Sequence, residues 1–167
     1  MSGKVQAIAW PAIQRLHADI EKVFAETASL LGEDIPRPRV TFDLPSSDPE
    51  PLHVFTLSEA RDFQIAGRLT NNTIVMTFDI GAVCVATAGN IEAASAIANA
   101  YQSLLLQVPL CDPMLGNTVN EIGMPQVDEY TVWQDADGRR HAGYRLSFNV
   151  SINVSESAAV REVLERD

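Results

Sequence analysis

The clearest hydrophobic pattern in the chain is an unbroken alternation over residues 144–154. Successive side chains of a strand point to opposite faces, so this alternation predicts a long strand with one buried face and one solvent-facing face. At about 3.3 Å per residue the strand would span roughly 36 Å, and we expect the other strands to be arranged around it. Its apolar positions are Tyr144, Leu146, Phe148, Val150, Ile152 and Val154, and its polar positions are Arg145, Ser147, Asn149, Ser151 and Asn153.

A second strand is predicted for residues 73–80, whose even-numbered positions are apolar and whose odd-numbered positions are mostly polar. Residues 82–86 are apolar on both faces, which is typical of a central strand, and Gly81 between the two runs predicts a β-bulge. The Asn-Asn pair at 71–72 accepts positive φ. We therefore expect it to join this strand to an extended stretch at residues 61–70.

Two amphipathic helices are predicted to cover the sheet. Over residues 11–31 apolar side chains recur at helical spacing, Pro11 suits the first turn, and Gly32 suits the position just past the end. Over residues 91–106 a second apolar stripe follows Asn90, which is a good N-cap.

Shorter elements complete the prediction. We expect short strands at residues 39–44, 53–57, 118–122 and 129–134, a surface loop at 45–51, a turn-rich connection at 109–116 and a tight turn at 135–138. The predicted fold is α+β, a mixed and mostly antiparallel β-sheet packed against two main helices, with a long C-terminal β-hairpin. We expect one domain over residues 1–167, with an N-terminal arm at 1–10 and a short helix or tail at 155–167.

Composition and charge exclude several classes of protein. The chain has 167 residues and is 46% hydrophobic, which is ordinary for a globular domain with a real core. We expect no signal peptide and no membrane span, and we expect the two cysteines to be reduced thiols made in a cytoplasm. The net charge is −10, and no Lys or Arg occurs between Arg68 and Arg139. Tight nucleic-acid binding relies on cations, so we do not expect it here.

No motif in the sequence indicates a catalytic, cofactor or metal site. No two histidines have metal-ligand spacing, and no glycine-rich phosphate loop occurs. The acidic turn at residues 135–138 resembles the opening of a calcium loop, but it lacks a third oxygen ligand and suits a hairpin turn better. Cys84 lies in an apolar strand, Cys111 has no basic neighbour, and the pair at 128–129 is expected to be solvated.

Two aromatic residues in the penultimate strand favour an interface. Tyr130 and Trp133 fall on opposite faces of that strand, so we expect at least one of them to be exposed, and exposed aromatic side chains often serve interfaces. The candidate interface residues are Trp10, Tyr130, Trp133, Arg139 and Arg140.

The order of the predicted elements resembles that of the tail terminator proteins of long-tailed bacteriophages, the lambda-type minor tail protein U and its relatives. The resemblance rests on the helix at 11–31, the strand at 73–86, the helix at 91–106, the connection Val-Pro-Leu-Cys-Asp-Pro-Met-Leu at 108–115, the acidic turn Asp-Ala-Asp-Gly at 135–138 and the alternating last strand. The loop at 45–51 and the residues after Val154 depart from the family's pattern.

The resemblance implies a structural role in a virion, at the tail or neck. Proteins of this family form a ring, commonly a hexamer, that caps the tail tube, stops its polymerisation and offers a surface for joining the head. The implied partners are other copies of the chain, the tail tube protein and the head–tail connector protein, while genomic DNA passes through without specific binding.

Two alternatives stay open at this point. The first is that the chain is another head–tail connector or adaptor component. The second is that it is a small ligand-binding or enzymatic α+β domain with a pocket between helices and sheet. A carboxylate with a shifted pKa in such a pocket would favour an enzyme, and the sequence identifies none. We expect no enzymatic turnover, and we expect disruption of edge-strand pairing to abolish assembly.

Overall fold

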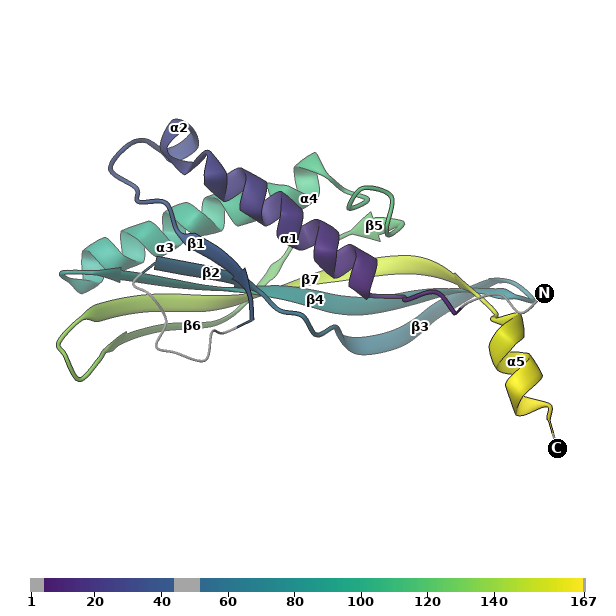
Figure 1. Ribbon diagram of the computed structural model, residues 1–167. Helices are drawn as coiled ribbons and strands as arrows, with labels where there is room; N and C mark the ends of the chain where they lie inside the picture. The colour runs from purple at the N-terminus through teal and green to yellow at the C-terminus, as the bar shows by residue number, and fades with distance from the viewer. Residues whose placement is uncertain (1–4, 44–51, 167) are drawn as a thin grey trace.

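The computed structural model describes residues 5–43 and 52–166 (Figure 1). The loop expected at 45–51 therefore lies outside the described residues, as do the first four residues of the expected N-terminal arm. The helices are α1 (Trp10–Ala25), α2 (Thr27–Leu31), α3 (Ile91–Leu105), α4 (Val108–Cys111) and α5 (Ala158–Leu164). The strands are β1 (Arg39–Phe42), β2 (Leu52–Thr56), β3 (Arg61–Thr70), β4 (Thr73–Ala88), β5 (Glu121–Ile122), β6 (Gln126–Gln134) and β7 (Arg140–Ser155).

The sheet is built on the antiparallel pair β4–β7. Its register is unbroken from Thr73 opposite Ser155 to Ala88 opposite Arg140. These are the two strands with the strongest alternation, and each is longer than the sequence pattern predicts. The alternation continues to Val154, but the side chains of β7 are fully buried only as far as Val150. Beyond that residue the strand pair extends past the helices, as Figure 1 shows.

The strands beside β4 and β7 change along their length, so the sheet has two halves. In one half the order is β1-β2-β4-β7-β6, with β1 parallel to β2 and the other pairs antiparallel. In the other half β3 replaces β2 beside β4, and the two-residue β5 replaces β6 beside β7. The sheet is therefore mixed and mostly antiparallel, and the predicted α+β class is confirmed.

Gly81 lies where the neighbour of β4 changes from β3 to β2. The predicted β-bulge is wrong, because Gly81 pairs with Ser147 in an unbroken register. Glycine is needed at this position because atoms of Leu146 and Leu57 approach it closely. A Cβ atom at this position would lie 2.9 Å from the carbonyl oxygen of Leu146 and 3.2 Å from Cδ1 of Leu57.

Helices α1 and α3 cover one face of the sheet, as Figure 1 shows. Helix α1 buries a stripe at helical spacing, and α3 contacts β4 and β7. Phe24 of α1 meets Tyr101 of α3 edge to face, with ring centroids 5.2 Å apart. The buried residues of α1 are Ala12, Ile13, Leu16, Ile20 and Phe24, and those of α3 are Ala94, Ala98, Tyr101, Leu104 and Leu105.

Other elements also differ from the predicted ones. The helix expected at 11–31 is interrupted at Glu26, and the hydroxyl of buried Thr27 donates a 2.7 Å hydrogen bond to the carbonyl of Phe24. A side-chain bond of this kind competes with the regular helical pattern. The connection expected at 109–116 contains the one-turn helix α4, which Pro109 can begin because its missing N–H is not needed there. Strand β6 begins at Gln126, three residues before the start of the strand predicted at 129–134.

Candidate assembly surfaces

The structure gathers four of the five candidate interface residues on the β6–β7 hairpin. Tyr130 and Trp133 lie in β6, Arg139 in the turn, and Arg140 at the start of β7. Trp10 is separate, at the beginning of α1, where its ring lies 5.7 Å from that of Phe42.

The two aromatic side chains of β6 lie on opposite faces of the sheet, as predicted, and both are exposed. The Tyr130 hydroxyl lies 3.0 Å from that of Ser95, so Tyr130 is on the face that the helices cover. Trp133 is on the other face, stacked on the ring of His141 with centroids 5.1 Å apart. A Cβ at Gly143 would lie 3.1 Å from the Trp133 ring, so the glycine makes room for it. One face of the indole packs on the sheet, and 38% of Trp133 is exposed to solvent.

The acidic hairpin turn is held by its own side chains. One carboxylate oxygen of Asp135 accepts hydrogen bonds from the backbone N–H groups of Asp137 and Arg139. The other accepts a 2.8 Å bond from the Arg139 side chain and lies 2.9 Å from Nε2 of His141. The hydrogen bond with His141, helped by those from Arg139, lowers the pKa of Asp135 to about 2. The turn uses this carboxylate as a scaffold, which agrees with the expected hairpin turn.

Thr87, His141 and Asp135 form a hydrogen-bonded row that the sequence did not reveal. The Thr87 hydroxyl lies 2.7 Å from Nδ1 of His141, and Nε2 of the same ring bonds Asp135. The order of groups resembles a hydroxyl–histidine–carboxylate triad. However, His141 is only 8% exposed, and the Trp133 ring lies against it. The row joins Thr87 of β4 to the β6–β7 hairpin, so it acts as a clamp between them.

The outer edge of β6 is the most exposed strand edge of this half of the sheet. Within residues 5–43 and 52–166, β6 pairs as a strand with β7 alone. Eight of its nine residues are exposed. A one-residue irregularity between Asp128 and Thr131 interrupts its register, and Glu129 there has a φ of 53°. The stretch from Thr131 to Gln134 is regular.

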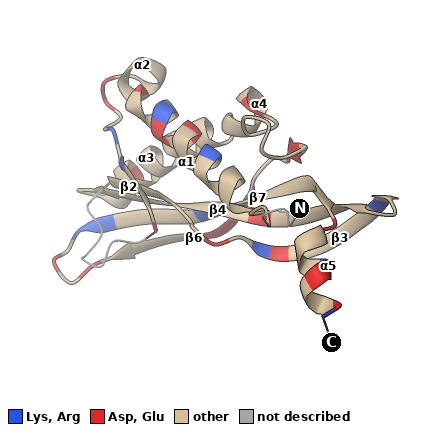
Figure 2. Ribbon diagram, turned by 45° about the vertical axis from the view of Figure 1, so that its right-hand side comes forward, with Lys and Arg blue, Asp and Glu red and all other residues tan. Residues whose placement is uncertain are grey.

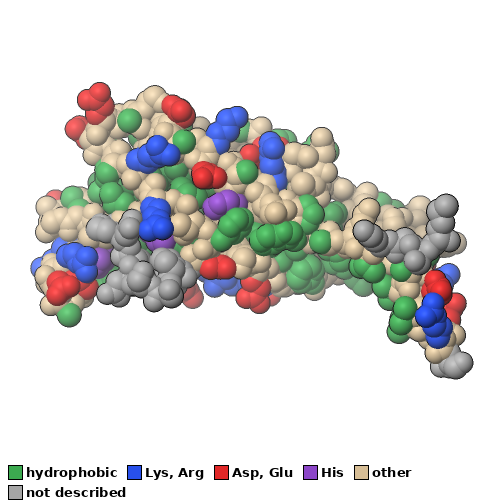
Figure 3. Space-filling view, viewed as in Figure 1, with side chains coloured by type: hydrophobic (Ala, Val, Ile, Leu, Met, Phe, Trp, Pro, Cys, Tyr) green, Lys and Arg blue, Asp and Glu red, His purple; other side chains and the backbone are tan. Residues whose placement is uncertain are grey.

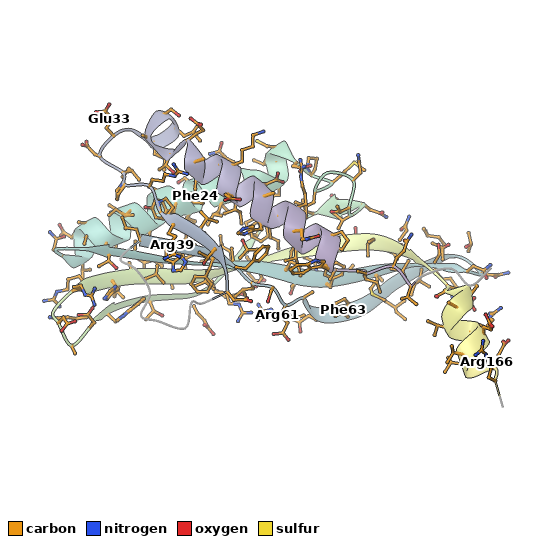
Figure 4. The ribbon with its side chains drawn as sticks, in the orientation of Figure 1. Phe24, Glu33, Arg39, Arg61, Phe63 and Arg166 are labelled. Carbon is orange, nitrogen blue, oxygen red and sulfur yellow. The ribbon has the colours of Figure 1, made fainter. Side chains whose placement is uncertain are left out.

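The opposite edge of the same half is β1, which in the described residues pairs with β2 alone. Beside it lies a groove of about 290 Å³ between α1 and β1. Its lining includes Phe24 and Val40, and the cations of Arg37 and Arg39 flank it. Figure 4 shows Phe24 on α1 above and Arg39 on β1 below.

In the other half of the sheet, β3 forms an edge with exposed apolar side chains. Phe63, Ile65 and Leu69 are each at least half exposed. Figure 3 shows hydrophobic side chains gathered along the lower middle of the molecule, where Figure 1 draws β3. Three register shifts within this one strand distort its edge. Such bulges make an edge a poor template for main-chain pairing.

A polar cluster joins the beginnings of β3 and β6 on the face away from the helices. Arg61 forms an ion pair of 3.3 Å with Asp128 and a 2.5 Å hydrogen bond with Ser147, which donates 2.8 Å to the same Asp128. The sequence analysis expected Asp128 to be solvated. In the structure its carboxylate is instead partnered by Arg61 and Ser147.

A pair of carboxyl groups with separated pKa values lies between α1 and the loop after α4. Burial, together with the neighbouring Asp112, raises the pKa of Asp19 to about 6. Burial acts on Asp112 too, but hydrogen bonds from Gly116 N–H, the Asp19 carboxyl and Arg15 outweigh it and lower the pKa. Arg15 bridges the two, 3.2 Å from Asp19 and 2.8 Å from Asp112. Only the Arg15–Asp19 spacing of four residues was visible in the sequence.

The remaining candidates for chemistry fit a structural role. Burial raises the pKa of Cys84 to about 12, so its thiol stays protonated at neutral pH, as expected for a core residue. Within residues 5–43 and 52–166, no group of three or more His, Cys, Asp or Glu side chains is placed to hold a metal ion. No helix in these ranges is long and apolar enough to cross a membrane.

No protein-family model matches the chain, and no curated protein is significantly similar to it. Among solved structures, a chain described as "Virion of native gene transfer agent (GTA) particle" matches 90% of this chain and 100% of its own length. The identity over the match is 12% and the TM-score is 0.43. Values this low do not establish a shared fold or a shared role.

Proposed function

We propose that the chain is a structural protein of a phage-like virion, and that it caps the tail tube as a homo-oligomeric ring. In this role it ends tail polymerisation and forms the surface to which the head joins. The order of elements supports the proposal. A long strand, a covering helix, an acidic hairpin turn and a second long strand follow one another as in the tail terminators that the sequence resembles.

The observation that carries the proposal is the pair of exposed sheet edges on opposite sides of one subunit. Strands β6 and β1 border the same half of the sheet, and each hydrogen-bonds to one neighbour only among the described residues. Exposed edges are templates for pairing with another chain. Two different edges on one subunit allow a head-to-tail contact, and such contacts close into rings when the rotation permits.

The charge distribution suits a ring through which DNA passes without binding. The net charge is −10. In Figure 2 the Lys and Arg positions of the described residues are scattered over several elements and do not form a continuous stripe. Without such a stripe few phosphate contacts can form, so DNA would not be held.

A second candidate is a small enzyme that uses Asp19 and Asp112 as acid and base, because their pKa values are moved apart. Three grooves are described beside α5, β3 and β1, and none of them is lined by either carboxyl group. Arg15 and the Gly116 N–H donate to the two carboxylate oxygens of Asp112, and the same Arg15 side chain lies 3.2 Å from Oδ1 of Asp19. We therefore propose that the protein has no enzymatic turnover.

The test is to delete the coding sequence from the genome that encodes this chain and to image the particles produced. Without a cap nothing stops the growth of the tube, so the expected products are headless tails of widely varying length. Supplying the wild-type protein in trans should restore one length. Tails of uniform, normal length without the protein would contradict the capping role, and normal free tails that fail to join heads would favour a connector.

A further inference from the structure

We infer that the β6 edge of one copy pairs with the β1 edge of the next copy, antiparallel, with Val132 opposite Val40. This inference rests on the proposed self-assembly and identifies the surfaces that meet. The partner is a second copy of this chain, because the two edges match each other in direction, length, side-chain type and charge.

The strand directions set the pairing mode. Strand β1 is parallel to β2, and each step from β2 to β4, β7 and β6 reverses direction. β1 and β6 therefore run in opposite directions within one subunit. When two copies lie side by side in the same orientation, β6 of one meets β1 of the other in antiparallel fashion, and the helices of both copies stay on the same side of the joined sheet.

The faces of the two strands match in one register. Val40 and Val132 lie in register with the core residues Val54 and Ala142, so both point to the helix-covered face. Placing these two valines opposite each other aligns residues of like kind at three of the four residues of β1. The resulting pairs are Arg39 with Trp133, Val40 with Val132, Thr41 with Thr131, and Phe42 with Tyr130.

These pairs are favourable cross-strand combinations. Aromatic pairs, threonine pairs and β-branched apolar pairs each stabilise neighbouring strands. The exposed face of the Trp133 indole would receive the Arg39 guanidinium, which is a favourable cation–π geometry. On the helix side, Val132 would enter the groove between α1 and β1, where Phe24 and Val40 provide apolar contacts.

Charge favours the same arrangement. The β1 edge and the two residues before it carry Arg37 and Arg39, while the stretch from Gln126 to Arg140 carries four acidic residues against two arginines. The contact thus brings a basic edge to an acidic hairpin, which steers encounter and disfavours pairing of like edges. The apolar β3 edge is the other possibility, but its three register shifts spoil the continuous row of hydrogen-bonding groups that pairing requires.

The test is disulfide cross-linking in a Cys111→Ser background, in which buried Cys84 is the only native thiol. Thr41→Cys and Thr131→Cys together place one thiol on each edge at directly opposed positions, within reach of a disulfide. After mild oxidation the double variant should give a ladder of covalent multimers on a non-reducing gel. Each single variant alone should stay monomeric, and a mixture of the two should give dimers and nothing larger.

The matched control is Thr70→Cys with Thr131→Cys, which moves the first thiol to the exposed end of β3. This control should give no ladder. Because Thr41 also bonds His53, a second variant that leaves β1 intact is needed. Val132→Lys should weaken self-association at least 10-fold by light scattering, whereas Val163→Lys on α5 should change it less than 2-fold.

The outcomes separate this inference from the proposed function. Rings that form while the Thr41–Thr131 pair fails to cross-link, or while Val132→Lys has no effect, overturn the β6–β1 pairing and leave the ring role standing. A protein that stays monomeric at every concentration overturns both.

Discussion

At the scale of single residues, Gly81 lets neighbouring strands approach closely because it has no side chain. The added Cβ of Gly81→Ala would lie 2.9 Å from a backbone oxygen, and backbone cannot move as a flexible side chain can. We expect this variant to lose about 1–3 kcal/mol of unfolding free energy through overpacking. Chemical denaturation measures the loss.

The control for this substitution is Gly67→Ala in β3, where an added Cβ would meet nothing within 4 Å. It should be neutral or slightly stabilising, since alanine reduces the freedom of the unfolded chain. Equal losses from both substitutions would contradict the role assigned to Gly81.

Asp19 is expected to make stability depend on pH. Burial and the neighbouring Asp112 raise its pKa from the ordinary value of 3.8 to about 6 in the folded protein. The protonated carboxyl is thus favoured by folding, so its stabilising contribution is complete below about pH 4 and is lost as the pH rises through 6. Asp19→Asn keeps a donor for Asp112 without the ionisation, and it should gain on the order of 1 kcal/mol at pH 7 relative to wild type.

The measurement for Asp19 is the melting temperature of both proteins from pH 4 to pH 8. The variant should show no advantage at pH 4 and an advantage of about 2–4 °C at pH 7. The low-pH loss caused by Asp135 is common to both proteins and cancels in the difference. A difference that does not vary with pH would show that Asp19 is not titrating as described.

The residues that the sequence could not predict are those whose roles depend on long-range contacts. Tyr130 and Trp133 were found because alternation alone puts them on opposite faces. The Asp19–Asp112 pair and the Thr87–His141 contact join residues far apart in the chain, and no local pattern records such distances. Trp10, the fifth candidate interface residue, lies apart from the hairpin and beside Phe42, which the sequence alone does not reveal.

At the scale of elements, hydrophobic periodicity predicted the strands and helices whose formation depends on burying one side. Strands β4 and β7 and helices α1 and α3 have strong patterns because each buries one side. The break at Glu26, helix α4 and the register shifts of β3 were missed. Local hydrogen bonds and the twist of the sheet determine these features, and neither leaves a hydrophobic repeat.

Helix α5 should be dispensable for folding. It contains no buried residue, and Val163 and Leu164 are exposed. Truncation after Ser157 is therefore expected to shift the melting temperature by less than about 2 °C, because no core contact is lost. Differential scanning calorimetry measures the shift.

Leu146→Ala in the core of β7 is the comparison for this truncation. It creates a cavity and should cost about 2–5 kcal/mol. A truncated chain that unfolds as readily as this variant would show that α5 belongs to the folding unit.

At the scale of the whole molecule, we propose that the chain is one segment of a closed ring. The extended sheet, its two dissimilar edges and the acidic charge together support that view. Among the described residues of one copy, β1 pairs only with β2 and β6 pairs only with β7. A neighbouring copy would satisfy both at once.

The most direct test is the mass of the purified protein by light scattering over a range of concentrations, with negative-stain images of the same samples. We expect a species of about six 18.2 kDa chains, seen as rings with a central opening. A mass of one chain at every concentration, with no rings in the images, would contradict it.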